Sequence, residues 1–160
     1  MEIPMLGGGR AWFDSSSPDH EGLRGSRKKI FGLLEEVEKD GIPADRIILG
    51  GFSQGAVASL DAGLRYPRRI GGIIGMSGFL AWPDLLKDEM SPAAAGLPIL
   101  LTHGKNDEVL PVDGAREAQA ALRTLGFDVC LREYLMAHEV VPEVLDEIKK
   151  FLKKVNGALE

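Results

Sequence analysis

The stretch Ile47-Ile48-Leu49-Gly50-Gly51-Phe52-Ser53-Gln54-Gly55-Ala56 decides the predicted fold. Its apolar first part predicts a buried strand, and the small residues that follow predict a helix. Gly51-Phe52-Ser53-Gln54-Gly55 has the G-x-S-x-G pattern of a nucleophile elbow, in which a strained strand-to-helix turn exposes a serine hydroxyl. We expect the glycines on either side to remove Cβ atoms that would collide in that turn. The alternative interpretation is a serine in a glycine-rich turn of a non-catalytic protein.

Strand and helix patterns alternate along the rest of the chain. Strands are predicted near 46–50, 70–76, 98–102 and 128–135, and helices near 17–40, 54–66, 84–88, 112–125 and 141–152, after an irregular segment at 1–20. This alternation predicts an α/β fold with one mostly parallel sheet of about four strands, covered by helices on both faces. Because no linker or repeat interrupts the pattern, we expect a single domain over residues 1–160.

The composition excludes several classes of function. The 160 residues carry a net charge of −5, which argues against nucleic acid or an anionic membrane as the main partner. No apolar run is long enough to span a bilayer. The single cysteine, Cys130, excludes an internal disulfide and favours the cytoplasm. One cysteine and three scattered histidines cannot supply a metal-ligand cluster, so we expect no metal site.

Three reactive side chains follow predicted strands, at the carboxyl ends where functional residues gather in a parallel sheet. They are Ser53, Asp107 and His138. A serine hydroxyl is a poor nucleophile until an imidazole accepts its proton, and the imidazole needs a carboxylate to fix its tautomer. The order Ser, Asp, His along the chain is that of α/β-hydrolases.

The sequence alone is compatible with simpler interpretations of these residues. Asp107 could be a turn or N-cap residue, with Glu108 and Asp113 as rival carboxylates, and His138 could be a surface histidine. His103, at another strand end, is expected to have a structural role.

Several motifs resemble the phospholipase/carboxylesterase family, which includes the acyl-protein thioesterases. The segment Gly50–Ala56 resembles the family's nucleophile segment, and His103-Gly104 with Asp107 and Val109-Leu110-Pro111 resembles its aspartate loop. Tyr134 to Val140 is similar to its histidine loop, and Ala11-Trp12-Phe13-Asp14 to a short Trp-aromatic-Asp segment. The resemblance implies that Ser53 is the nucleophile, His138 the general base and then acid, and Asp107 the orienting carboxylate. Ala137 stands where the family usually has glycine.

The resemblance also implies a reduced, truncated α/β-hydrolase, without the family's N-terminal strands and the loop that donates one oxyanion-hole amide. The backbone N–H of Gln54, the residue after the nucleophile, can supply one donor. Gly7-Gly8-Gly9 is a candidate for the second, although a surface loop explains it as well. The nucleophile strand would then be an apolar sheet edge, and such edges invite pairing. We therefore expect homo-oligomers that form through this edge.

A set of apolar side chains in loops at the reactive strand ends could line an acyl pocket, although core packing explains them nearly as well: Phe79, Leu80, Trp82, Leu110 and Met136. The resulting hypothesis is a serine carboxylesterase that hydrolyses short- to medium-chain acyl esters through an acyl-enzyme, with no cofactor. Alternatives are a thioesterase or lysophospholipase that uses the same triad, and a non-catalytic hydrolase remnant that serves as a binding or assembly module.

Overall fold

The computed structural model describes residues 11–14 and 21–157. The elements in chain order are α1 (Glu21–Lys39), β1 (Ile48–Phe52), α2 (Gln54–Gly63), β2 (Gly72–Met76), α3 (Pro83–Glu89), β3 (Pro98–Gly104), α4 (Asp113–Thr124), β4 (Asp128–Tyr134) and α5 (Pro142–Gly157). Short 3-10 turns lie at Ala44–Arg46 and Pro92–Ala94. The part of the first helix that was predicted at 17–20, and most of the irregular segment at 1–20, fall outside the described residues.

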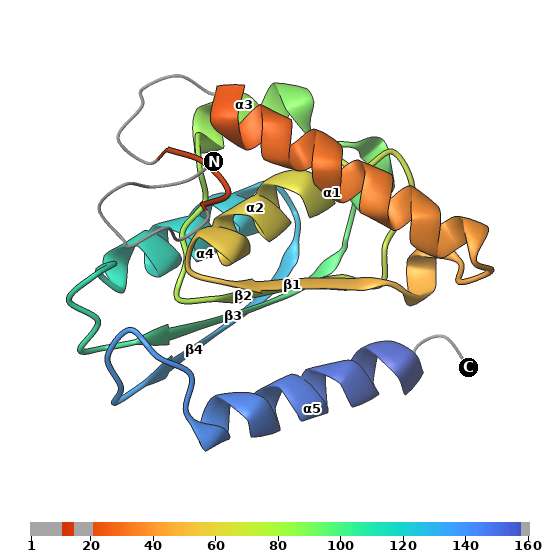
Figure 1. Ribbon diagram of the computed structural model, residues 1–160. Coiled ribbons are helices and arrows are strands. Elements are labelled where there is room, and N and C mark those ends of the chain that lie inside the picture. Colours follow the sequence, from red (N-terminus) through yellow and green to blue (C-terminus); the bar gives the residue numbers. More distant parts are fainter. Residues whose placement is uncertain (1–10, 15–20, 158–160) are drawn as a thin grey trace.

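The four strands form one sheet in the order β1-β2-β3-β4, and every neighbouring pair is parallel. This confirms the predicted α/β architecture with a parallel sheet (Figure 1). Because all strands run the same way, their carboxyl ends lie along one edge of the sheet. The segments that follow Phe52, Met76, Gly104 and Tyr134 therefore emerge together.

Helices cover both faces of the sheet, as predicted (Figure 1). α1 and α2 lie on one face, where α2 buries eight of its ten residues and the larger core includes Leu60, Ile73, Leu101 and Leu122. α5 lies on the opposite face over a smaller core of Ile74, Leu100, Phe151 and Val155. None of the helices within the described ranges is long and apolar enough to cross a membrane.

Two strands extend further toward their carboxyl ends than the sequence pattern predicts. β1 was predicted at 46–50 but occupies Ile48–Phe52, because Gly50 and Gly51 stay in register with Ile74 and Gly75 instead of turning. β3 runs to Gly104, since His103 and Gly104 still pair with β4. In both cases glycines predicted as turn residues belong to the ladder. The chain turns only after them, where the site is built.

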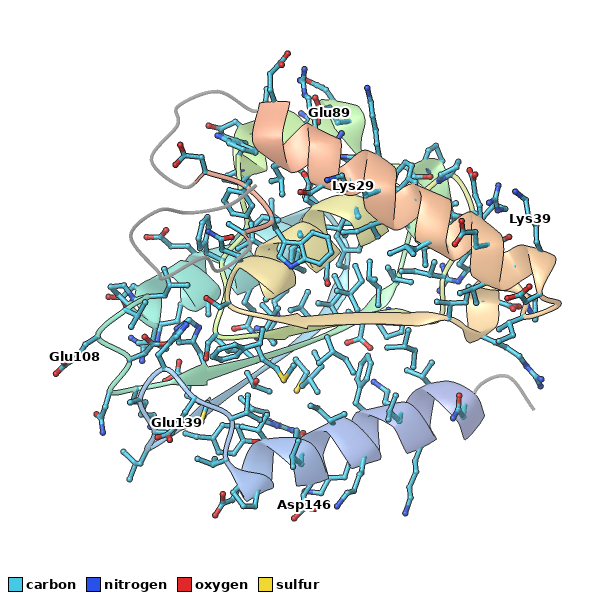
Figure 2. The ribbon with its side chains drawn as sticks, in the orientation of Figure 1. Lys29, Lys39, Glu89, Glu108, Glu139 and Asp146 are labelled. Atoms are coloured by element: carbon cyan, nitrogen blue, oxygen red, sulfur yellow. The ribbon has the colours of Figure 1, made fainter. Side chains whose placement is uncertain are left out.

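A buried ionic cluster joins α1, α2 and α3. Asp61 of α2 accepts hydrogen bonds from Arg27 Nε at 2.7 Å, Arg27 Nη2 at 2.9 Å and Arg65 Nη1 at 2.8 Å. Arg65 Nε donates in turn to Glu89 of α3 at 2.8 Å. Arg24 Nη2 reaches the other oxygen of Glu89 at 3.3 Å, where α3 approaches α1 (Figure 2). These five side chains hold the three helices on one face of the sheet.

β1 lies at the edge of the sheet, and within the part of the chain that the structure describes it pairs only with β2. A groove of about 490 Å³ runs between β1 and α1. Its lining is mostly apolar and includes the exposed side chains of Trp12, Leu33 and Phe52. As far as residues 11–14 and 21–157 show, this edge presents unpaired backbone groups beside apolar surface.

Candidate active site

Ser53 occupies the turn between β1 and α2 in a backbone conformation with positive φ, at φ 55° and ψ −123°. Such a conformation costs a non-glycine residue about 1–3 kcal/mol, so its surroundings must hold it. The Ser53 N–H donates to the Met76 carbonyl at 2.9 Å, and the Ser53 carbonyl accepts from the N–H groups of Ala56 at 3.0 Å and Val57 at 3.3 Å. The turn thus has the strained strand–helix geometry that was predicted.

The two glycines of the elbow are not equivalent. A Cβ atom at Gly51 would lie 2.2 Å from the carbonyl carbon of Gly55 and 2.7 Å from the nitrogen of Ala56. A Cβ atom at Gly55 would meet only the Trp12 ring nitrogen, at an ordinary 3.7 Å. The expectation that both Cβ atoms would collide is therefore right for Gly51 and wrong for Gly55, because only Gly51 faces the backbone of the turn.

His138 connects the serine to a carboxylate. Its Nε2 lies 3.0 Å from Ser53 Oγ, and its Nδ1 lies 2.7 Å from Asp107 Oδ2. The three residues come from different segments, since Ser53 follows β1, Asp107 follows β3 and His138 follows β4. Because a carboxylate can only accept, Nδ1 carries the hydrogen and Nε2 is left to accept one from the serine hydroxyl. The structure brings together the three side chains that the sequence singled out.

Asp107 is held by its own loop. The side chain is 0% exposed, and its Oδ1 accepts from the N–H groups of Val109 at 2.9 Å and Leu110 at 2.8 Å. Burial favours a higher pKa for this carboxyl, but the Leu110 N–H, the His138 imidazole and the Val109 N–H outweigh it and hold the pKa below its ordinary value. Asp107 is therefore a fixed negative charge beside His138.

The rival carboxylates lie elsewhere. Glu108 is exposed and points outward from the loop after β3 (Figure 2). Asp113 begins α4 and pairs with Arg116 at 2.9 Å. Neither contributes to the hydrogen bonds of His138.

Aromatic residues flank the reactive groups on the β1 side. The ring centroid of Phe52 lies 4.8 Å from that of His138, and Phe52 is partly exposed. The backbone N–H of Trp12 donates to the side-chain oxygen of Gln54 at 3.1 Å, which connects the segment at 11–14 to the elbow. The sequence pattern assigned Phe52 no role, although its place directly before the serine was a signal.

Gln54 is the first residue of α2, so its backbone N–H lies among the first amides of a helix, which have no intrahelical acceptor. This amide lies beside Ser53, as an oxyanion donor must. Gly7-Gly8-Gly9, the candidate second donor, lies outside the described residues.

The five side chains considered for an acyl pocket are not equally placed. Phe79 and Leu80 line a cavity of about 220 Å³ together with Pro83, Gly114, Glu117 and Ala118. Trp82, Leu110 and Met136 are not among the residues that line this cavity, and Met136 is almost fully buried. Across residues 11–14 and 21–157, no three His, Cys, Asp or Glu side chains gather in a way that could hold a metal ion.

Comparisons with known proteins identify relatives of this chain. The chain is 37% identical to acyl-protein thioesterase 1 of Gibberella zeae over 159 residues, which cover 96% of this chain and 66% of that relative. It thus spans slightly less than two thirds of that relative's length. Among solved structures it superposes on acyl-protein thioesterase 2 of Zea mays with a TM-score of 0.77 and 31% identity, over 91% of this chain and 72% of the other.

Arabidopsis thaliana SOBER1 shares the fold, with a TM-score of 0.81 at 22% identity over 91% of this chain and 70% of the other. The sequence profile that describes the Phospholipase/Carboxylesterase family matches residues 1–156. The chain belongs to the phospholipase/carboxylesterase family of α/β-hydrolases.

Proposed function

We propose that this protein is a serine hydrolase that cleaves acyl esters or thioesters through an acyl-enzyme, with Ser53, His138 and Asp107 as its catalytic triad. The observation that carries the proposal is the continuous hydrogen-bonded path from Ser53 Oγ to His138 Nε2, at 3.0 Å, and from His138 Nδ1 to Asp107 Oδ2, at 2.7 Å. Both distances fall within the range in which a proton can pass from nucleophile to base.

The proposed reaction begins when Ser53 Oγ attacks the acyl carbonyl while His138 Nε2 takes the hydroxyl proton. Asp107 stabilises the imidazolium that forms, and the Gln54 N–H donates to the developing oxyanion. The carbon–oxygen or carbon–sulfur bond then breaks, and His138 returns its proton to the departing alcohol or thiol. A water molecule, deprotonated by His138, attacks the acyl-enzyme; the acid leaves and Ser53 regains its proton. No organic cofactor is needed for these steps.

For the substrate we propose short- to medium-chain acyl esters, with thioesters as an equal alternative. The small apolar cavity beside Phe79 and Leu80 supports an acyl chain of limited length. Relatives named acyl-protein thioesterase support the thioester alternative. A panel of ester and thioester pairs with identical acyl chains separates the two, because the acyl pocket then contributes equally and only the leaving group differs.

Hydrolysis of a chromogenic short-chain ester tests the proposal. We expect Ser53→Ala to lower kcat by at least about 1,000-fold, since the nucleophile is lost and only binding and oxyanion stabilisation remain. Ser59→Ala, in the adjoining helix, is a matched control that should keep wild-type turnover, because Ser59 takes part in none of the hydrogen bonds described for the site. Equal rates for the wild type and Ser53→Ala would instead favour a non-catalytic binding or assembly module.

We also propose that the chain, acting as one domain in the cytoplasm, self-associates through the edge of β1. The support is the edge of β1, which has no second partner strand among the described residues and lies beside the exposed side chains of Leu33 and Phe52. Light scattering at micromolar concentration should give a mass above the 17.3 kDa of one chain, and Leu33→Glu should reduce it. A monomer under these conditions overturns this proposal and leaves the hydrolase proposal untouched.

A further inference from the structure

A second histidine lies beside the candidate triad without touching Ser53. His103 is the penultimate residue of β3, and its side chain is completely buried, at 0% exposure. Its Nε2 lies 2.8 Å from the carbonyl oxygen of Leu110. Since a carbonyl can only accept, Nε2 carries the hydrogen of this bond. The imidazole therefore fixes a point on the loop that carries Asp107.

Leu110 is the shared partner of the two side chains. Its carbonyl accepts from His103, while its N–H donates to Asp107 Oδ1 at 2.8 Å. The loop 107–110 is thus hydrogen-bonded to β3 through the Leu110 carbonyl and to Asp107 through the Leu110 N–H. Any displacement of Leu110 would move the hydrogen-bond donor that orients the carboxylate.

The same carboxylate oxygen has two imidazole neighbours at unequal distances. Asp107 Oδ2 lies 2.7 Å from His138 Nδ1 and 3.4 Å from His103 Nε2. The longer contact leaves the His103 hydrogen with the Leu110 carbonyl, so the strong bond of Oδ2 goes to His138. The two histidines consequently have different roles, because His138 is hydrogen-bonded to the serine, whereas the polar contacts of the His103 ring are with Leu110 and Asp107 of the aspartate loop.

The other ring nitrogen of His103, Nδ1, also indicates that this side chain has a role besides packing. Among the described residues, Nδ1 is buried without a hydrogen-bond partner, as is the hydroxyl of Ser77 directly after the neighbouring strand β2. An unpaired buried polar atom is unfavourable, and an apolar side chain of similar size would avoid it. An imidazole at this position is therefore a poor choice for stability alone.

From these contacts we infer that His103 is a positioning residue that holds the loop 107–110 so that Asp107 faces His138. The inference rests on the proposed function, because it assigns His103 a part in the same reaction. His103 neither accepts the serine proton nor contacts the substrate. It acts only through Leu110 and Asp107.

The test compares the turnover and thermal unfolding of His103→Leu and His103→Gln. Leu fills the space without a donor, so we expect kcat to fall roughly 10- to 100-fold with KM nearly unchanged, since small displacements of a reacting group have effects of this size. Gln keeps an N–H within reach of the Leu110 carbonyl and should recover part of kcat. The thermal midpoint of His103→Leu should stay close to that of the wild type, because the loss of the bond to the Leu110 carbonyl offsets the removal of the unpaired Nδ1.

Two further variants make the result specific. In an Asp107→Ala background, His103→Leu should lower kcat no further, because its only route to the reaction has been removed. Thr102→Val is the matched control: Thr102 is the preceding residue, 1% exposed, with a hydroxyl that has no partner among the described residues, and kcat should not change. Wild-type kcat for a folded His103→Leu, or a further full loss in the Asp107→Ala background, would overturn the inference.

Ser53→Ala, measured in the same series, separates this inference from the proposed function. If Ser53→Ala is inactive while His103→Leu keeps wild-type turnover, only the role of His103 is refuted. If Ser53→Ala is as active as the wild type, the hydrolase proposal itself fails.

Discussion

Two buried aspartates in this molecule are hydrogen-bonded by different kinds of partner. Asp107, in the loop after β3, is 7% exposed and is hydrogen-bonded by backbone amides and an imidazole. Asp61, in the last turn of α2, is 2% exposed and is bonded by the guanidinium groups of Arg27 and Arg65. Both carboxylates have their negative charge compensated, and by burial alone they are indistinguishable.

The difference lies in what each partner can do with a proton. A guanidinium keeps its proton at any pH a protein experiences, so the ion pairs of Asp61 can hold helices together and nothing more. An imidazole exchanges its proton near neutral pH, so the bond from His138 to Asp107 can pass through a charged and a neutral state. A buried carboxylate therefore indicates chemistry only when its partner can change charge.

Replacing Asp107 should give the largest effect. Asp107→Asn preserves the size of the side chain but turns its hydrogen bond to His138 around, which places the imidazole hydrogen on the nitrogen that faces Ser53. We expect kcat for a chromogenic ester to fall about 10,000-fold. The thermal midpoint, measured on the same preparation, should move little. Activity within about tenfold of the wild type would remove Asp107 from the triad.

The same substitution in the ionic cluster should act on stability instead. Asp61→Asn removes the more deeply buried of the two carboxylates that Arg27 and Arg65 share and leaves only Glu89 to pair with them. Breaking a buried pair lowers the free energy of unfolding by up to about 3–5 kcal/mol. Urea unfolding measures this change. Turnover at temperatures where the variant remains folded should match the wild type. A drop in kcat comparable to that of Asp107→Asn would break the comparison.

Tyr66 should make part of the free energy of unfolding depend on pH. Burial of Tyr66, together with the hydrogen bond that its hydroxyl donates to Glu38, raises the pKa of Tyr66 to about 12. Between its unfolded value of about 10 and this value, the unfolded chain loses the phenolic proton while the folded chain keeps it. The contribution of Tyr66 to the free energy of unfolding should therefore be fully present below about pH 10. It should fall by about 2–3 kcal/mol as the pH rises to about 12.

Urea unfolding of the wild type and Tyr66→Phe across that pH range measures this loss. The Phe variant, which has no phenolic proton at this position, should show a weaker alkaline decline. Parallel declines in the two proteins would mean that other groups cause the effect.

An exposed aspartate should give the smallest effect. Asp128, at the start of β4, pairs with Lys154 of α5 at 3.1 Å, with the two side chains 64% and 70% exposed. Exposed pairs contribute about 0.2–1 kcal/mol, so Asp128→Asn should change the free energy of unfolding by less than about 1 kcal/mol and leave kcat unchanged. The effect should also vanish in high salt. A larger change would show that exposure does not separate this pair from the buried ones.

The sequence predicted the candidate site residues better than it predicted the ends of the strands that carry them. Ser53, Asp107 and His138 could be found because each lies in the segment that follows a strand, and a parallel sheet brings such positions to one edge. The ends of β1 and β3 were misjudged because glycine is common both in turns and in close-packed strands. The sequence pattern alone does not decide between these uses.

The ionic cluster was missed for a different reason. Arg27 and Glu89 are far from Asp61 along the chain and come close to it only in the fold, so no periodicity connects the three residues. A signal did exist, since Asp61 is the only charged residue in the otherwise small and apolar helix Gln54–Gly63. The role of His103 likewise depends on a contact with Leu110 that no spacing rule describes.

Gly104, at the end of β3, has a consequence for how the site could change over time. A Cβ atom there would lie 2.3 Å from the carbonyl oxygen of Met136 and 2.4 Å from that of Ala137, directly before His138. The distance between the aspartate and histidine loops is therefore set by bare main chain. Side chains around the two loops can be exchanged without altering that distance, whereas a single added methyl group at Gly104 would force the loops apart. The side chains around this site can therefore change far more freely than the spacing of the two loops.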